Sequence, residues 1–434
     1  MPRTIIPHRE ERPRGARLEG RTARLQDAAG AGVNDGRAVG GADYLLSAAA
    51  VRERCAIVLA AAERGETRHF RLVPARLDDA VERVVAVTRR RYPDLAVPLH
   101  SRWRHFGVGG IDRAALIAPG ADRAEAARAR LDLAIVSVLL DAGAGPGWVY
   151  REAETRQVLG RSEGLAVASL RAMQAGLFSS DPSRPWRADT AALATLSADR
   201  LGRAFQHGPD NPLAGLEGRA LLLRRLGEVA AARPEIFGAP ARLGHLHDFW
   251  GPRRDGLPAP DMLGLVLRAL GAIWPGRLAL GGVPLGDCGR HGAVAGDGIV
   301  PFHKLSQWLV YSLVEPLADA GFEVSGLDGL TGLAEYRNGG LFLDCGAIIA
   351  RDPDLLRRPL DPFGEPVVEW RALTVALLDR LAERVRDRLD RSAAEFPLAK
   401  VLEGGSWTAG REIAAERRRE GGAPLVIASD GTLF

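Results

Sequence analysis

Residues 51–65 read VRERCAIVLAAAERG, and their apolar side chains recur with the spacing of one helix face. Intervals of three and four residues are the period of an amphipathic α-helix. The residues that share this face are Val51, Cys55, Val58, Leu59 and Ala62. Gly65 follows and suits the left-handed conformation in which many helices end. The stretch therefore predicts a helix that buries one stripe.

The same helical pattern continues along most of the chain. Asp78 and Asp79 begin a second helix that stops before Pro93, and a third runs over about 124–140. Further helical patterns lie near 163–177, 189–206, 214–232, 260–273, 303–319, 369–390 and 408–419. Strand-like stretches are few and short, at 278–285, 341–349 and 424–428. Because a βαβ alternation is missing, the sequence predicts a mainly α protein, a large helical body with a few short β-strands.

The excess positive charge lies at the beginning of the chain. The 434 residues have a formal charge of +4, but residues 1–25 hold seven Arg against three Glu, and the other residues carry 51 basic and 51 acidic side chains. Nucleic-acid binding needs a basic face, so a charge-balanced body argues against a nucleic-acid partner. We predict a disordered basic tail over 1–41 and a single helical catalytic body over 42–434, with two lobes joined near 250–260.

The cysteines and the apolar runs indicate in which cellular compartment the protein is expected. Cys55, Cys288 and Cys345 lie far apart without C-x-x-C spacing, which argues against a disulfide framework and against a thiolate zinc site. No uncharged apolar run reaches the roughly 18 residues of a membrane span, and the start of the chain lacks the apolar segment of a secretion signal. The sequence therefore predicts a cytoplasmic protein without membrane contact.

Two short motifs are only partial matches to known sites. Residues 141–147, DAGAGPG, have G-x-G-x-G spacing without the third Gly of a dinucleotide loop or the Lys of a phosphate loop, and are interpreted as a tight turn after a helix. Asp141 in this turn is a candidate pocket residue. His245, His247 and Asp248 form an H-x-H-D cluster, but no strand pattern surrounds them to bring both imidazoles to one face. We therefore predict no metal site and no cofactor.

The densest group of polar side chains lies between residues 285 and 344. Asp287 and Glu335 are predicted to transfer protons, because cleaving a bond to a poor leaving group needs a base for water and an acid for the departing atom. Arg290, Lys304 and Arg337 can neutralise a phosphate, the arginines through their bidentate fork. Clustering of these types within sixty residues predicts a pocket.

Lys304 is unusual in this composition. The chain has only two lysines, Lys304 and Lys400, against 56 arginines, so a lysine at this position suggests a specific contact. Trp308 or Tyr336 can supply an aromatic wall for a planar group. Other polar residues of the same segment that we include among the candidate site residues are His303 and Gln307. Farther along, Ser406 or Thr408 is predicted to cap the helix near 408–419.

Several segments resemble the uracil catabolism protein four family, whose fungal members are uracil-regulated. They are SRWRHF at 101–106, LDLAIVSVLLDAGAGPGW at 131–148, VPFHKLSQWL at 300–309, EYRNGG at 335–340 and KVLEGG at 400–405. The likeness runs from about residue 43 to SDGTLF at 429–434. It implies a role in a pyrimidine-breakdown route in which uracil becomes a nucleotide and a cyclohydrolase-like enzyme opens its ring.

A fainter resemblance is to the queuosine salvage nucleosidases. It rests on WVY at 148–150, SEG at 162–164, the segments 205–210 and 213–226, FHKLSQWL at 302–309 and EYR at 335–337. It implies a fold like that of the helix-hairpin-helix DNA glycosylases and cleavage of an N-glycosidic bond. The chain departs from that family at Glu335, where the relatives carry Asp, and at 338–340, where NGG replaces Val-Pro-Gln. These departures concern the leaving group more than the type of bond.

Together the two resemblances imply hydrolysis of a ring-opened uracil nucleotide such as ribosylurea 5-phosphate, giving urea and ribose 5-phosphate. Asp287 is expected to stabilise the ribosyl oxocarbenium ion and orient water. Glu335 or His303 would protonate the leaving nitrogen, while Lys304, Arg337 and Arg290 hold the phosphate.

Two alternatives stay open at this stage. One is a metal-dependent amidohydrolase acting on a ureide, with His245 and His247 as metal ligands. The other is a non-catalytic partner of the cyclohydrolase-like enzyme that opens the ring.

Overall fold

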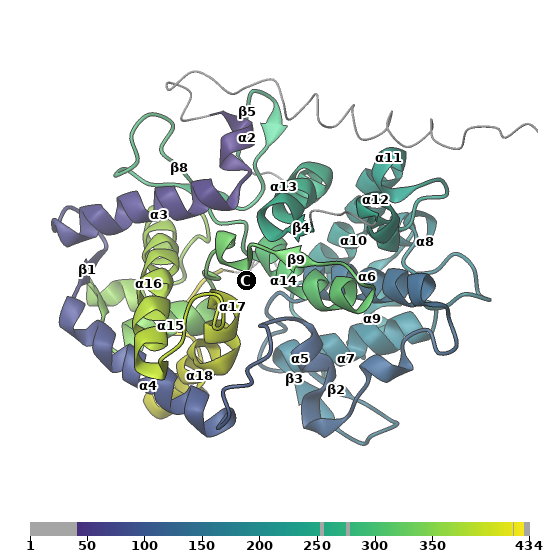
Figure 1. The fold of residues 1–434 in the computed structure, drawn as a ribbon, viewed down its shortest axis with the longest axis horizontal. Coiled ribbons are helices and arrows are strands. Elements are labelled where there is room, and N and C mark those ends of the chain that lie inside the picture. The colour runs from purple at the N-terminus through teal and green to yellow at the C-terminus, as the bar shows by residue number, and fades with distance from the viewer. Residues whose placement is uncertain (1–40, 252–255, 275–277, 420, 429–434) are drawn as a thin grey trace, which may run out of the picture. The chain divides into compact units, whose positions relative to one another are not determined.

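The computed structural model describes residues 41–251, 256–274, 278–419 and 421–428. Within these ranges helices predominate and every strand has two or three residues (Figure 1), which confirms the predicted mainly α fold. The described residues from Ala42 onward form one compact unit. The likeness to the helix-hairpin-helix fold stays a prediction. So does the boundary near 250–260, part of which lies outside the described residues. The predicted tail over 1–41 lies almost wholly outside them too.

The helices match the predicted ranges closely at most positions. In chain order they are α2 (Ala42–Leu45), α3 (Ala48–Glu63), α4 (Leu77–Arg91), α5 (Trp103–Phe106), α6 (Arg123–Leu139), α7 (Arg161–Gln174), α8 (Thr190–Ala194), α9 (Ala198–Ala204), α10 (Leu216–Ala231), α11 (Pro234–Phe237), α12 (Leu246–Trp250), α13 (Ala259–Leu270), α14 (Lys304–Asp319), α15 (Tyr336–Asp344), α16 (Glu365–Leu389), α17 (Leu398–Val401) and α18 (Trp407–Arg417). A short π-helical segment, Leu402–Ser406, joins α17 to α18.

The strands pair only two at a time. Four pairs are antiparallel: β1 (Phe70–Leu72) with β10 (Ile348–Ala350), β2 (Val149–Arg151) with β3 (Val158–Gly160), β5 (Ala279–Leu280) with β6 (Val283–Pro284), and β7 (Cys288–Arg290) with β8 (Ile299–Pro301). One pair is parallel, β4 (Leu257–Pro258) with β9 (Val324–Ser325). The predicted strand at 278–285 is the β5–β6 hairpin, and the one at 424–428 supplies an isolated bridge from Ile427 to Leu360.

Two predictions of secondary structure are wrong. The stretch 341–349 was expected as a strand, but its first part continues α15 and only its end belongs to β10. The range 189–206 was expected as one helix, but it divides into α8 and α9 because the Ser197 side chain accepts the Arg200 N–H and begins a new helix. Local capping accounts for the second error, since a serine that accepts the N–H three residues later favours the start of a new helix.

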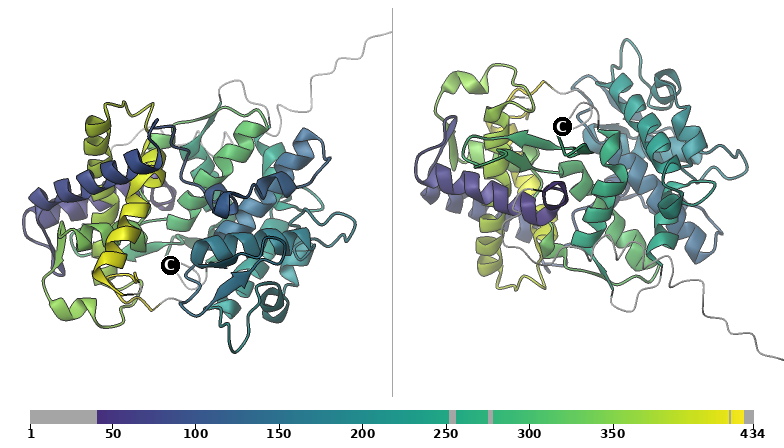
Figure 2. Two further views of the ribbon diagram at one scale, coloured as in Figure 1. Left: turned by 90° about the horizontal axis from the view of Figure 1, so that it is seen from below. Right: turned by 90° about the horizontal axis from the view of Figure 1, so that it is seen from above.

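Helices from the two ends of the described chain pack together. α16 lies against α3 and α4, and α18 lies against α15, as Figures 1 and 2 show. In the middle of the chain, α6 packs on α14 and α8 packs on α10. Within this core some side chains are fully buried arginines, namely Arg102, Arg113, Arg219, Arg242 and Arg371. Each of these arginines hydrogen-bonds a carboxylate or a carbonyl group, as a buried charge requires.

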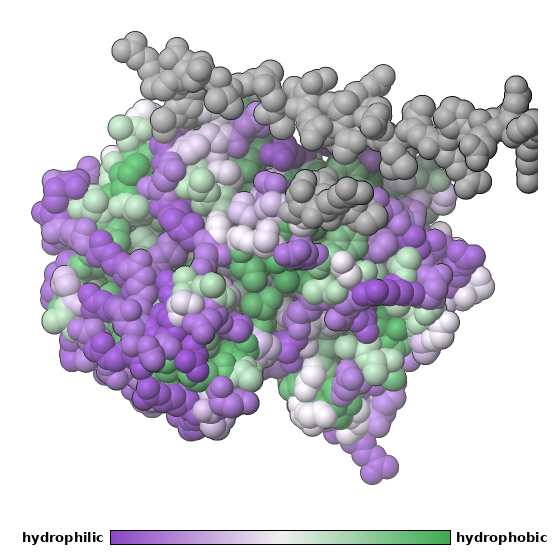
Figure 3. Space-filling model, in the orientation of Figure 1, coloured by the Kyte–Doolittle hydropathy of each residue, from purple (hydrophilic) through white to green (hydrophobic). Residues whose placement is uncertain are grey.

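The surface is mostly hydrophilic on the face drawn in Figure 3. Hydrophilic residues cover most of the part formed by α3, α4 and α16, and hydrophobic residues show mainly near the centre. Among the helices of the described ranges, none combines the length and the apolarity needed to cross a membrane.

Candidate functional site

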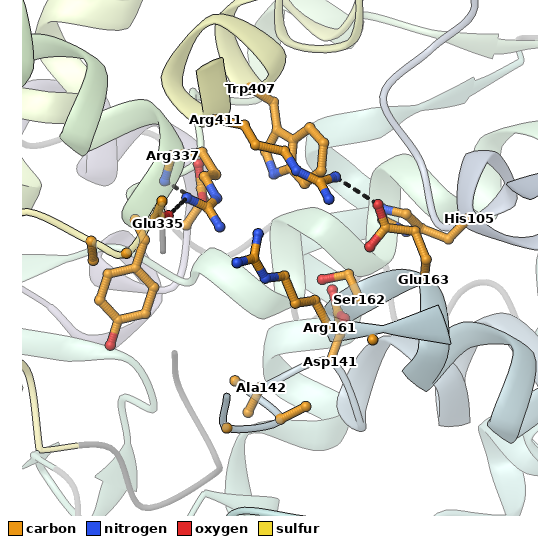
Figure 4. Close-up of a pocket in the computed structure, with 18 of the residues that line it drawn as sticks. His105, Asp141, Ala142, Arg161, Ser162, Glu163, Glu335, Arg337, Trp407 and Arg411 are labelled. Atoms are coloured by element: carbon orange, nitrogen blue, oxygen red, sulfur yellow. Dashed lines mark hydrogen bonds and ion pairs between the residues drawn. The ribbon is translucent and has the colours of Figure 1, made fainter. Parts of the chain in front are cut away.

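A cavity of about 750 Å³ opens where six parts of the body meet. They are α5, the turn after α6, the start of α7, and the starts of α14, α15 and α18 (Figure 4). Its charged lining consists of Asp141, Arg161, Glu163, Lys304, Glu335, Arg337 and Arg411. Its aromatic and imidazole lining consists of His100, His105, Trp148, Trp308, Tyr336 and Trp407. The cavity has the volume usual for small-molecule sites.

Six of the sequence-predicted site residues line this cavity. They are Asp141, Lys304, Trp308, Glu335, Tyr336 and Arg337. The other four, Asp287, Arg290, His303 and Gln307, lie outside its lining. The tertiary structure thus gathers residues from 141, 304 and 335, which the chain keeps far apart.

Asp287 is engaged in the protein interior, away from the cavity lining. It is 4% exposed, and its two oxygens accept hydrogen bonds of 2.7 Å from Nη1 and Nη2 of Arg371. Its Oδ2 also accepts the Lys304 backbone N–H at 3.0 Å. Burial by itself would raise the pKa of Asp287, but Arg371 holds it below its usual value. Asp287 therefore fixes the beginning of α14, which differs from its predicted role at the oxocarbenium ion.

Three more predicted site residues support the backbone instead of lining the cavity. His303 Nε2 donates to the Leu45 carbonyl at 2.8 Å. Gln307 donates from Nε2 to Thr331 Oγ1 at 2.6 Å and accepts the Thr331 N–H at 2.8 Å. Arg290 is exposed and donates to the Asp297 carbonyl. His303 and Gln307 thus hold the beginning of α14, which lines the cavity through Lys304 and Trp308.

Asp141 and Lys304 form the buried charged part of the cavity. Arg102 Nη1 donates to Asp141 Oδ1 at 2.8 Å. Burial would raise the pKa of Asp141, but Arg102, with smaller effects from His105 and Lys304, holds it below its usual value. Burial lowers the pKa of the Lys304 ammonium, although Asp141 and Glu335 act in the opposite direction. A carboxylate that stays ionised thus lies near an ammonium that loses its proton more easily than usual.

The turn at 141–147 forms one wall of the cavity. Arg219 fixes this turn from the protein interior, since its Nη2 donates to the Ala142 and Gly143 carbonyls at 2.8 Å each. Gly145 has φ +85°, which an L side chain rarely adopts. The turn after a helix that the sequence predicted is present, and its position makes it part of the site.

Glu335 and Arg337 belong to the first turn of α15. Glu335 precedes the helix, and its oxygens accept the backbone N–H groups of Arg337 at 2.7 Å and of Asn338 at 2.6 Å. Arg337 Nη1 donates to the Gly421 carbonyl at 2.9 Å. Tyr336 lies between them in sequence, and burial raises its pKa to about 12. Glu335 therefore caps a helix whose first turn lines the cavity (Figure 4).

Five further charged or imidazole residues line the site and were not among the predictions, and His100 is the first of them along the chain. Glu163 Oε1 accepts from Arg411 Nη1 at 2.8 Å, and the Arg411 guanidinium lies 5.4 Å from the Trp407 ring centre. Arg161 begins α7. His105 lies beside Arg102, and burial, reinforced by the Arg102 charge, lowers its pKa to about 4. The sequence could have indicated His105 and Glu163, because they lie in SRWRHF and SEG, two segments that carry the family resemblances. Nothing in the sequence distinguishes Arg161 and Arg411 from the other arginines among the 56.

His100 connects the cavity to the π-helical segment. Its Nδ1 donates to Glu403 Oε2 at 2.9 Å, and its ring centre lies 4.5 Å from that of Trp308. Burial would raise the pKa of Glu403, but His100 and Arg91 hold it below its usual value. Ser406, in the same segment, does not cap α18 as expected, because its Oγ donates to Asn338 Oδ1 at 2.8 Å.

The H-x-H-D cluster lies apart from the cavity lining. His245 Nδ1 donates to the Phe237 carbonyl at 2.7 Å, and His247 Nδ1 bonds to Asp248 Oδ1 at 3.2 Å. Asp248 also accepts two hydrogen bonds of 2.7 Å from Arg128. Over the described ranges, no group of three or more His, Cys, Asp and Glu side chains is arranged to hold a metal ion.

Fold and cavity together define a class of protein: a mainly helical body with one cavity that carboxylates, cations and aromatic rings line together. Residues 44–434 match the family described as "Protein of unknown function (DUF1688)". Protein urg3 of Schizosaccharomyces pombe is 41% identical over 401 residues, covering 90% of this chain and 98% of urg3. Uracil catabolism protein 4 of Lachancea kluyveri is 36% identical, with the same two coverages. The chain belongs to the family of these proteins, as its sequence segments indicated.

Proposed function

We propose that this protein acts in uracil catabolism and hydrolyses the N-glycosidic bond of a ring-opened uracil nucleotide such as ribosylurea 5-phosphate. The printed name of one relative, uracil catabolism protein 4, supports the pathway. The observation that carries the reaction is that Asp141 and Lys304 line one cavity, where the charge of Asp141 acts on the Lys304 ammonium. A glycosidic bond to a poor leaving group needs an anion at the developing oxocarbenium ion and an acid at the departing nitrogen.

Asp141 takes the anionic role in this proposal in place of Asp287. Because Arg102 keeps Asp141 ionised, its carboxylate can stabilise positive charge at C1′ of the ribose and orient water toward that carbon. A low pKa suits this role, since water that attacks an oxocarbenium ion needs only a weak base. Asp287 contributes by holding the backbone N–H of Lys304.

Lys304 supplies the proton for the leaving nitrogen. The C1′–N bond breaks with its electron pair on nitrogen, the Lys304 ammonium protonates that nitrogen, and neutral urea departs. Water forms the new C1′–O bond, and its proton passes to Asp141. Asp141 gains one proton and Lys304 loses one, so the numbers balance. Proton exchange with solvent then returns Asp141 to the carboxylate and Lys304 to the ammonium form. Burial eases the ammonium's loss of a proton, which supports this assignment.

Trp308 gives the site its planar wall. It is 3% exposed and lines the cavity together with His100, whose ring it contacts. Both rings offer flat apolar area to the planar urea group. Water access to the leaving group is limited on that side, which favours protonation by a side chain over protonation by solvent.

The direct test supplies ribosylurea 5-phosphate to the pure full-length protein and measures urea. We expect turnover, and we expect Asp141→Asn to lower it by about 100-fold or more. Asp199→Asn, at an exposed position of α9, is the matched control and should turn over normally. Circular dichroism checks that each variant is folded. Absence of urea with folded wild-type protein contradicts the proposal.

The same assay separates the two alternatives. A metal-dependent amidohydrolase would lose activity on a ureide after chelation, and His245→Gln would lower it. A non-catalytic partner would form a stable complex with the cyclohydrolase-like enzyme, and Asp141→Asn would leave the pathway unaffected. Under our proposal, urea release continues in the presence of a chelator.

A further inference from the structure

We propose that Arg161, Arg337 and Arg411 form a subsite for a phosphomonoester, which would hold the 5′-phosphate of the substrate. The three guanidinium groups come from the starts of α7, α15 and α18 and point into the same part of the cavity (Figure 4). The inference rests on the proposed function for the identity of the substrate. The anion site itself rests on the positions and charges of the residues that line the cavity.

All three arginines line the cavity, and two of them are fixed there by contacts with the protein. Arg411 is fixed by Glu163 through Nη1 and lies over the Trp407 ring. Arg337 is fixed by the Gly421 carbonyl through Nη1. Arg161 is exposed and is the first residue of α7. Two of the three are thus preorganised by protein contacts that use one nitrogen, and arginine has donors to spare for an anion.

The three positive charges oppose one another. Burial lowers the pKa of Arg337, and the charges of Arg161 and Arg411 lower it further, against Glu335 and Glu163. Such mutual repulsion is relieved when a dianion enters, and guanidinium forks match phosphate oxygens in bidentate geometry. The site is therefore electrostatically suited to a doubly charged ligand.

The two nearby carboxylates do not cancel this preference. Both oxygens of Glu335 are occupied by the backbone N–H groups of Arg337 and Asn338. Glu163 is committed to Arg411. Counting the whole charged lining, four cations face three carboxylates, and the buried Arg102 behind Asp141 adds a fifth positive charge.

The start of α7 adds a second source of positive potential. The helix has 14 residues and begins after Gly160, which has no side chain to cap it. Gly160, Arg161 and Ser162 all line the cavity. The helix dipole at such a start favours an anion.

This subsite orients the substrate. With the phosphate among the three arginines, the ribose lies toward Asp141 and Lys304, and the ureido group lies toward Trp308 and His100. The protein should therefore select the phosphorylated compound over free ribosylurea. Arg290, which the sequence assigned to the phosphate, has no part in this arrangement.

The test measures binding of ribose 5-phosphate, ribose and inorganic phosphate to the full chain by calorimetry. We expect ribose 5-phosphate to bind at least about tenfold more tightly than ribose, and Arg161→Gln, Arg337→Gln and Arg411→Gln each to weaken it by about tenfold or more. Arg290→Gln is the matched control and should bind as the wild type does. Arg411→Lys keeps the charge but loses the fork, and should bind between wild type and Arg411→Gln.

Three results would overturn the subsite: equal affinity for ribose and ribose 5-phosphate, unchanged affinity in folded glutamine variants, or an equal loss in Arg290→Gln. Failure of the proposed reaction looks different. Ribose 5-phosphate would then bind through the three arginines while ribosylurea 5-phosphate is not hydrolysed. Conversely, turnover with an unchanged KM in all three variants would remove the subsite and leave the reaction standing.

Discussion

Asp287 connects α16 to the beginning of α14 through a buried ion pair. Replacing it by Asn leaves the charge of Arg371 without its carboxylate in the interior, so we expect the free energy of unfolding to fall by about 3–5 kcal/mol. Asp379→Asn is the matched control, because Asp379 pairs with Arg52 in a partly exposed ion pair and should cost less than about 1 kcal/mol. Urea denaturation measures both. A stable Asp287→Asn protein without turnover would instead place Asp287 in the chemistry.

His105 should stay neutral in the folded protein through the physiological pH range. Burial, together with the Arg102 charge and a smaller effect of His100, lowers its pKa to about 4, against the opposing charges of Asp141 and Glu163. Since the unfolded value is about 6.5, its contribution to stability is complete above pH 6.5 and is lost as the pH falls toward 4. The loss at pH 5 should be about 2 kcal/mol.

The measurement compares urea denaturation of the wild type and of His105→Gln at pH 7.5 and pH 5. The variant should lack this part of the pH dependence, because Gln does not titrate. A titration of the His105 ring by NMR with a midpoint near the unfolded value would contradict the prediction.

Residue identity alone predicted six members of the cavity lining and missed others equally close. Lys304 stood out because lysine is rare in this chain, and Glu335 and Arg337 stood out because they lie in one polar segment. Arg161 and Arg411 carry no such signal, since most cations of the chain are arginines on solvated faces. Asp287 has the sequence context of a catalytic carboxylate, and only its position outside the cavity lining distinguishes it from Asp141.

Contact between α15 and α18 determines whether Arg337 and Arg411 face the same space. A Cβ at Gly410 would lie 2.1 Å from the Arg337 carbonyl oxygen, a backbone atom that cannot move aside. Gly410→Ala should therefore separate the helices, lower the free energy of unfolding by roughly 1–3 kcal/mol and weaken binding of ribose 5-phosphate.

Gly271→Ala is the control for this substitution. Gly271 has helical angles, and an added Cβ there meets its nearest neighbour, the Pro284 carbonyl oxygen, at an ordinary 3.6 Å. Urea denaturation measures the stability of both variants, and calorimetry measures their binding of ribose 5-phosphate. Equal effects in the two proteins would contradict a specific role for the α15–α18 contact.

At the scale of helices and strands, the spacing of apolar residues predicted most helices correctly. Where it failed, helix capping or close packing explains the difference. The run LFL at 341–343 reads as a strand, yet it lies in α15, because Glu335 caps the helix and Gly339 lets it approach Trp370. A Cβ at Gly339 would stand 2.4 Å from Trp370 Cζ2. Neither contact is visible in the local sequence.

Ligand binding should stabilise the body as a whole, because the cavity lining runs from His100 to Ala423. A ligand that binds only the folded state adds about 2.7 kcal/mol at a concentration 100 times its Kd. We expect ribose 5-phosphate to raise the Tm of the full chain in a concentration-dependent way. Arg337→Gln should show a smaller rise at the same concentration, and ribose should give little. A Tm that ribose 5-phosphate leaves unchanged at saturation would contradict binding at this cavity.

The sequence by itself determined the helical class, most helix positions, the family and part of the site, because period, capping residues and rare residue types are local signals. Only the tertiary structure decided which charges face the cavity and which serve the interior. Asp287 and Asp141 each pair with a buried arginine, but Asp141 lines the cavity with Lys304, whereas Asp287 lies outside the lining. Contacts between residues hundreds of positions apart carry that information, and they form only when the helices pack.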